Sequence, residues 1–158
     1  MEKVDDDPIA ALYGRPGFLL RRANQIAAAL FLEAVAGYDI TTTQYGALVV
    51  IGARGLIDQI GLARMLGLDR STAGLVIANL ERRGTIERTS DPEDKRRRVL
   101  TLAPAGKKLL EDIATAAARV SERELAIFSQ REAQEFVRLL TKFVTTFNTT
   151  VRTPLLGD

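Results

Sequence analysis

The sequence predicts a single, mainly helical domain that contains one short β-hairpin. Three observations indicate this fold class. Apolar residues recur at helical spacing through most of the 158 residues, and glycines and capping residues divide this pattern into separate helices. One stretch in the second half of the chain changes to the branched residues that are typical of strands. The length suits one domain with its own core, residues 1–158, and is short for two.

Two residue types are absent, and their absence narrows the possible functions. The chain has no cysteine and no histidine, which excludes disulfides, thiol redox switches, imidazole bases, and thiolate or imidazole metal ligands. Carboxylates, lysine, tyrosine and hydroxyls would have to perform any catalysis, and the sequence shows no convergent pair of acids. We therefore expect no enzyme, and we predict no catalytic residue, no metal site and no cofactor.

The charge is balanced, and the sequence shows no targeting segment. The net charge is only +2, so a binding site for a polyanion would have to be local. The first residues, "MEKVDDD", are acidic where a secretory signal is positive, and no apolar run reaches the roughly 18 residues that a membrane span requires. We expect a cytoplasmic protein without a membrane partner.

Two helices are predicted in the first part of the chain. The first covers about residues 16–37, where a proline stands just inside the start and a glycine follows the last apolar position. Its polar face carries Arg21, Arg22 and Gln25. The second helix begins at a capping box formed by Thr41 and Gln44 and ends at Gly55.

Two short helices follow, separated by a tight turn. Asp58 can cap "QIGLARML", Asp69 can cap "RSTAGLVIANLERR", and only "GLD" stands between these segments. The glycine of this turn lies where a left-handed residue is needed. The spacing is typical of a helix-turn-helix, in which the second helix enters the major groove of DNA. The alternative is an ordinary pair of capped helices in a bundle.

The second helix of this pair has one face that can pack on the domain and one that can approach DNA. The packing face consists of Ala73, Val76, Ile77 and Leu80. The other face carries Arg70, Ser71, Thr72, Gly74, Leu75 and Asn79. Guanidinium, hydroxyl and amide groups can hydrogen-bond bases or phosphates. We therefore predict DNA contacts from four residues, which are Arg70, Ser71, Thr72 and Asn79.

A β-hairpin with a charged tip is predicted next. "TIE" and "RRVLTL" have the composition of strands, and "SDPED" that of the turn between them. A hairpin directly after a recognition helix is a wing, and cations at its tip can enter the minor groove of DNA. We predict DNA contacts from the four cations in this stretch, which are Lys95, Arg96, Arg97 and Arg98.

Three acids accompany these cations, and they can hold the neighbouring guanidiniums in shape. They are Asp91, Glu93 and Asp94. The alternative is a solvated run of charges, which is the usual explanation of such a cluster. The position of the run, one strand after the helix pair, favours the wing.

Two further helices are predicted near the end of the sequence. One begins at Pro104, and the other begins at a capping box formed by Ser129 and Glu132. Each has apolar residues along one face, so each can pack against another helix.

The chain resembles the multiple antibiotic resistance regulator (MarR) family of winged-helix transcription factors. The matching stretches are "LARMLGLDRSTAGLVIANLERRGTIER" for the helix pair, "SDPEDKRRRVLTLAPAGKKLL" for the wing and its exit, and "FSQREAQEFVRLLTKF". Together with the first helix, the similarity spans about residues 16–150. It is specific because the helix pair, the D-x-R wing and the L-x-P-x-G exit occur in the right order.

This resemblance implies one MarR-like domain with two parts. Residues 16–37 and 104–150 correspond to dimerisation helices, and residues 41–102 to a winged helix-turn-helix lobe that binds DNA. Members of the family are homodimers with interlocked terminal helices, so two copies would bind a pseudo-palindromic double-stranded operator. By position, Asp94 matches the aspartate that supports the wing and Arg96 the arginine that reaches the minor groove, with the next two arginines as further contacts.

The sequence departs from the family pattern at two positions. Leu75 stands in the recognition helix where relatives often have a polar or basic residue. Ala103 stands at the wing exit where threonine is usual, which removes a helix cap.

The resemblance also implies a small-molecule effector in a crevice between the dimer helices and the DNA-binding lobe. "GRPGFLLRRANQI" is similar to the first helix of members that respond to aromatic carboxylates or their coenzyme A thioesters. Arg21 and Arg22 could pair with a carboxylate, Gln25 could hydrogen-bond it, and Tyr45 could stack on a ring. The alternative is that both arginines are solvated or form dimer salt bridges, and that Tyr45 belongs to the core.

Taken together, the sequence predicts a ligand-responsive transcriptional regulator that binds specific DNA as a homodimer. We expect repression that a small aromatic acid or its thioester relieves. The alternative is a winged-helix module that binds another protein and has no specific DNA site.

Overall fold

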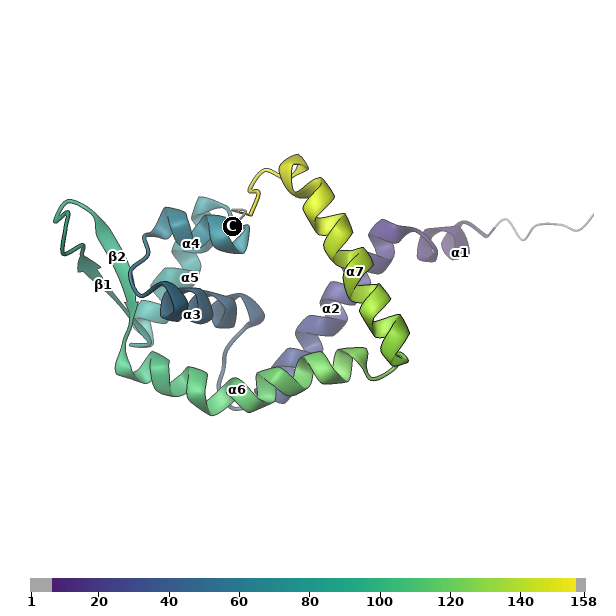
Figure 1. Cartoon of the computed structure of the whole chain (residues 1–158), viewed down its shortest axis with the longest axis horizontal. Coiled ribbons are helices and arrows are strands. Elements are labelled where there is room, and N and C mark those ends of the chain that lie inside the picture. The colour runs from purple at the N-terminus through teal and green to yellow at the C-terminus, as the bar shows by residue number, and fades with distance from the viewer. Residues whose placement is uncertain (1–6, 156–158) are drawn as a thin grey trace, which may run out of the picture.

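The computed structural model of the chain describes residues 7–155 and confirms a mainly helical fold with one two-stranded antiparallel sheet. Figure 1 shows a lobe that carries the hairpin at one end of a long helix and a separate helical arm at its other end. The α-helices are α1 (Pro8–Tyr13), α2 (Pro16–Ala34), α3 (Thr42–Arg54), α4 (Gln59–Leu66), α5 (Arg70–Arg82), α6 (Pro104–Leu125) and α7 (Gln130–Phe147). The strands are β1 (Ile86–Ser90) and β2 (Arg98–Leu102), and a 3-10 turn, η1 (Asn148–Thr150), follows α7.

The lobe consists of α3, α4, α5 and the hairpin, and its apolar core continues into buried residues of α2 and α6. The predicted packing face of α5 is buried there, together with Leu48 and Ile51 of α3 and Leu62 of α4. Ile57, between α3 and α4, forms a bridge to Leu100 of β2, with N–O distances of 3.4 and 2.7 Å. The helix pair is therefore attached to the hairpin by both apolar packing and backbone hydrogen bonds.

Local chemistry starts and ends the helices of the lobe where the sequence predicts it. Thr41 and Gln44 form the capping box of α3, and the side chain of Asp58 accepts the Gly61 amide at 2.7 Å to cap α4. Gly67 ends α4 with φ +63°, a left-handed conformation that glycine adopts without steric cost. The starts of α3 and α4 and the turn that ends α4 thus follow from three local signals.

Helix α6 leaves the hairpin through a close contact that requires glycine. A Cβ atom at Gly106 would collide with the carbonyl oxygen of Thr85, just before β1. The amide of Ala103 donates a 3.1 Å hydrogen bond to that same oxygen. This contact fixes the start of α6 against the base of the hairpin and gives a physical reason for glycine in the wing exit.

Outside the lobe, α2 packs along α6. Helix α7 forms the arm at the end of α6 away from the hairpin, on the right in Figure 1. One face of α7 is apolar and exposed, with Phe136, Leu139, Leu140, Phe143 and Phe147 on it. On α2, the apolar residues Leu19, Ile26 and Leu32 are also exposed. Within residues 7–155, no helix has the length and the apolar character needed to cross a membrane.

Strand β1, Ile86–Ser90, is longer than the "TIE" stretch predicted for it, and two features outside the lobe also differ from the predictions. The first long helix ends at Ala34 rather than near residue 37, because the chain turns through Gly37 at φ +96°. The short helix α1 was not predicted, and it begins where the Asp7 side chain accepts the Ile9 amide at 2.9 Å. Neither difference alters the lobe.

Candidate nucleic-acid interface

The start of α5 presents exposed polar groups at the surface of the lobe. Asp69 caps the helix by accepting the Thr72 amide at 2.9 Å and the Thr72 hydroxyl at 2.8 Å. These hydrogen bonds lower the pKa of Asp69, the amide bond contributing most. Arg70 and Ser71 are exposed beside the cap. Of the predicted contacts here, two side chains therefore point outward, while the Thr72 hydroxyl is engaged by the cap.

Asn79 interacts with its own lobe. Its Oδ1 atom accepts a 2.9 Å hydrogen bond from Nε2 of Gln44 on α3, and the side chain is half-buried. The bond ties the second half of α5 to the start of α3. A contact of Asn79 with DNA stays a prediction.

The acids of the hairpin turn shape its backbone. Oδ1 of Asp94 accepts the Arg96 amide at 3.0 Å, its carbonyl oxygen accepts the Arg97 amide at 2.9 Å, and Oδ1 of Asp91 accepts the Glu93 amide at 2.9 Å. Asp94 thus supports the tip through main-chain bonds. The predicted grip of an acid on a guanidinium is seen at Asp91, which lies 3.6 Å from Nη1 of Arg97.

Arg97 anchors the hairpin to the helix pair. Its Nε and Nη2 atoms lie 3.0 and 2.9 Å from Oδ2 of Asp58, the residue that caps α4. The Gly61 amide holds the pKa of Asp58 below its ordinary value of 3.8, partial burial opposes this shift, and Arg97 adds to it. The structure therefore assigns Arg97 an internal contact, whereas Lys95, Arg96 and Arg98 lie exposed at the tip.

A basic hollow lies between the helix pair and the hairpin. Four guanidinium side chains line it, from α5, β1, the turn and β2, and these are Arg70, Arg88, Arg97 and Arg98. Arg88 also pairs with Glu81 of α5 at 3.1 and 3.2 Å. The hollow therefore gathers four cations on a chain with a net charge of only +2, and two of them, Arg88 and Arg97, are paired with acids.

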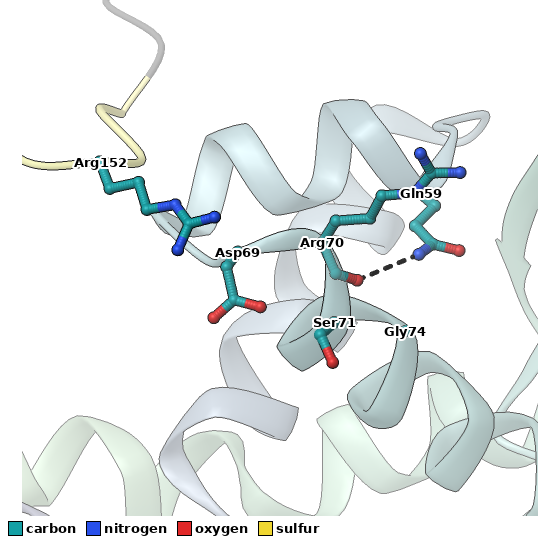
Figure 2. Close-up of a pocket in the computed structure, with 6 residues that line it drawn as sticks. All are labelled: Gln59, Asp69, Arg70, Ser71, Gly74 and Arg152. Atoms are coloured by element: carbon teal, nitrogen blue, oxygen red, sulfur yellow. Dashed lines mark hydrogen bonds between the residues drawn. The ribbon is translucent and has the colours of Figure 1, made fainter.

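A second hollow, at the N-terminus of α5, includes a residue that the sequence did not indicate. Figure 2 shows Gln59, Asp69, Arg70, Ser71 and Gly74 around it, with Arg152 reaching in from the C-terminal segment. The hydroxyl of Thr153 donates a 2.9 Å hydrogen bond to the carbonyl oxygen of Gly67. No local pattern predicts Arg152 here, because the contact joins segments 86 residues apart.

The predicted effector residues lie on one side of α2 and on α3. Nη1 of Arg22 donates to Oε1 of Gln25 at 3.1 Å, and the guanidinium of Arg21 lies 5.0 Å from the centre of the Phe18 ring. The half-buried Tyr45 packs on Phe31, with ring centres 5.3 Å apart. Phe31 follows Gln25 by six residues, about 9 Å along the helix. The polar cluster therefore lies at a different position along α2 from the one on which Tyr45 packs, and the two do not contact each other.

Acidic side chains of the described residues form helix caps and ion pairs. Among the described residues, no group of acidic side chains is arranged to hold a metal ion. Several ion pairs connect elements of the fold, as Arg123 of α6 does with Glu33 of α2 at 3.1 Å.

Comparison with known proteins identifies the family. The model of the MarR family matches residues 40–97. The transcriptional regulator HosA of Escherichia coli is 31% identical over 108 residues, which cover 68% of this chain and 80% of HosA. These residues of the family model coincide with the helix pair and most of the hairpin.

Solved structures extend the likeness to nearly the whole fold. A probable transcriptional regulator from Pseudomonas aeruginosa has 39% identity and a TM-score of 0.78, covering 84% of this chain and 98% of its own. BpsR from Bordetella bronchiseptica has 27% identity, a TM-score of 0.77, and covers 83% and 94%. CouR from Rhodococcus jostii, in a complex with a 23-mer DNA duplex, has 26% identity, a TM-score of 0.78, and covers 86% and 96%. The chain is thus a member of the MarR family, a winged-helix transcriptional regulator and not an enzyme.

Proposed function

We propose that this protein is a cytoplasmic repressor that binds a pseudo-palindromic operator as a homodimer and leaves it when a small aromatic carboxylate, or its coenzyme A thioester, binds. The observation that carries the proposal is the basic surface between α5 and the hairpin, because four guanidiniums converge there beside the exposed start of a recognition helix. CouR, which has the same fold, is found on a DNA duplex.

In this proposal residues 41–102 bind DNA. Arg70 and Ser71, at the exposed start of α5, contact base edges or phosphates in the major groove. The hairpin tip carries Arg96 into the adjacent minor groove, where the negative potential attracts a guanidinium. Arg97 contributes by holding the hairpin at a fixed angle to the helix pair through Asp58.

The helices outside the lobe, residues 16–37 and 104–150, form the dimer. Five large apolar side chains on α7 are each at least 38% exposed in the single chain, and a contiguous apolar patch of this kind marks a protein interface. Helix α2 adds further exposed apolar residues, Leu19, Ile26 and Leu32. A second copy buries these faces. The resulting dimer has two-fold symmetry, which matches that of a pseudo-palindromic operator.

The effector site uses the polar cluster of α2. Arg22 and Gln25 are held together by a 3.1 Å hydrogen bond and present a cation and an amide to an anionic ligand. Arg21 supplies a second cation, and Tyr45, which lies beside Phe31 and apart from this cluster, supplies a ring to a ligand long enough to reach both. The DNA binding of BpsR is regulated by 6-hydroxynicotinic acid, an aromatic carboxylate. Such a ligand acts only if it binds one arrangement of the lobes more tightly than the other.

Selection of DNA from a random pool tests the proposal. We expect enrichment of an inverted repeat, and release of that DNA by one of a panel of aromatic acids and thioesters that includes 6-hydroxynicotinic acid. A coupling of about 1 to 3 kcal/mol corresponds to a decrease in operator affinity of roughly 5- to 150-fold. A pool without enriched sequence would favour a protein-binding module, and an effector that binds tightly without altering operator affinity would refute the switch.

A further inference from the structure

Leu75 is an exposed apolar side chain in the middle of the recognition helix. It is 71% exposed, while the apolar face of α5 that fills the core lies on the opposite side of the helix. Leu75 therefore adds little to the packing of its own lobe. The large apolar patch that suits a protein partner lies elsewhere, on α7.

The residues around Leu75 leave it prominent. Ser71 lies one helical turn before it and Ala78 about one turn after it, both exposed, and Gly74 is its neighbour in the chain. These three side chains are the smallest types available, so Leu75 is the one bulky group on this strip of α5. Exposed arginines, Arg70 and Arg82, stand at the two ends of the helix. This strip of α5 thus has an arginine at each end and small residues in the middle, from which only Leu75 protrudes.

The major groove of DNA offers one partner for such a projection. Each base pair displays hydrogen-bond donors and acceptors there, and thymine also displays a C5-methyl group. A leucine placed against an amine or a carbonyl would remove that polar group from water without giving it a hydrogen bond, which is unfavourable. Against a methyl group, both surfaces leave water with no such loss.

We propose that Leu75 determines specificity by contacting a thymine methyl group at one base pair in each operator half-site. This inference rests on the proposed DNA binding of α5. It gives a positive role to one of the two residues at which the sequence departs from the family pattern.

Deoxyuridine lacks only the methyl group of thymidine, so it provides the test. Each thymine of the selected operator is replaced in turn by deoxyuridine in both half-sites, and affinity is measured by fluorescence anisotropy. At one position, the replacement should lower the affinity of the wild-type protein for the operator by about fourfold for each methyl group removed, or about 15-fold for both half-sites. This is the effect expected for burial of a methyl-sized group.

Three variants make the assignment specific to Leu75. Leu75→Ala should bind the thymine and uracil operators with equal affinity, and Leu75→Met, which keeps an apolar contact, should retain the preference for thymine. Ile9→Ala is the matched control, because Ile9 is a 57% exposed aliphatic residue in α1, outside the segments proposed for the dimer and for DNA. It should show the same ratio as the wild type, and thermal unfolding should confirm that each variant is folded.

The outcomes separate this inference from the proposed function. An operator with no methyl-sensitive thymine, or a sensitivity that persists in Leu75→Ala, would overturn the role of Leu75 and leave DNA binding intact. Failure to select any specific DNA would overturn the proposed function, and this inference with it.

Discussion

Removal of the negative charge of Asp58 should weaken DNA binding, because Asp58 anchors Arg97. Charge alone would predict the opposite, since a protein with one fewer negative charge should bind DNA more tightly. The perturbation is Asp58→Asn, which keeps a side-chain oxygen to cap α4 but removes the charge that holds the guanidinium. Two N–O distances of 3.0 and 2.9 Å join the pair, and the Arg97 side chain is 52% exposed. Because water screens so exposed a pair, we assign it about 0.5 to 1 kcal/mol, or roughly two- to fivefold in an equilibrium constant.

The loss of this anchor should weaken operator binding by roughly that factor, since the hairpin must then be ordered when DNA binds. Removal of a negative charge alone should have the reverse effect and strengthen binding to a polyanion. Asp112→Asn provides the matched control, because Asp112 forms its ion pair within α6, with Lys108 at 2.8 Å. It removes the same charge without touching the hairpin, so its affinity should be unchanged or slightly higher.

Fluorescence anisotropy on the selected operator measures these affinities, and urea unfolding of Asp58→Asn, Arg97→Gln and the double variant measures the coupling energy. The contribution of Asp58 is complete above its ordinary pKa of 3.8 and is lost as the pH falls through its lowered pKa in the fold, so the coupling should be constant near neutrality. If Asp58→Asn binds DNA as tightly as Asp112→Asn and the coupling energy is zero, Arg97 does not anchor the hairpin.

Three further predictions concern the hairpin tip, the wing exit and the arm. Arg96→Ala should weaken operator binding by about 1 to 3 kcal/mol with an unchanged melting temperature. An affinity equal to that of the wild type would mean that the charged tip is only a solvated run of charges. Gly106→Ala should destabilise the fold by about 1 to 3 kcal/mol in thermal unfolding, because its methyl group meets the Thr85 carbonyl. Gly17→Ala, in an open position of α2, should be neutral or slightly stabilising, and similar losses in both variants would contradict the collision. Phe143→Glu, in the exposed face of α7, should shift sedimentation from dimer to monomer while circular dichroism stays helical, and an unchanged dimer would exclude this face as the interface.

Much of the lobe could be predicted from the sequence because short-range chemistry determines it. Asp58 and Asp69 cap helices at the positions expected, and Gly67 adopts the left-handed turn between them. The packing face of α5 follows from helical periodicity alone, and all four of its residues are buried. Each of these features depends on residues within one or two turns of each other.

The contacts that position the site were harder to predict, because they join distant segments. Arg97 reaches Asp58 across 39 residues, and Gln44 reaches Asn79 across 35. Each gives a residue that the sequence indicated for DNA an internal contact that holds two elements together, and DNA contacts of both residues stay predictions. Arg152 is the opposite example, because the sequence did not indicate it and the structure places it at the start of α5. The hydrogen bond from Thr153 to Gly67 holds its segment there.

The central claim is that the surface of α5 and the hairpin holds a specific operator, and a salt series of fluorescence anisotropy tests it most directly. The wild-type protein is titrated onto the selected operator and onto a scrambled duplex at increasing ionic strength. The account predicts an operator affinity in about the nanomolar range that falls steeply as salt rises, with much weaker binding to the scrambled duplex. Equal, weak affinities for the two duplexes, with little dependence on salt, would contradict it.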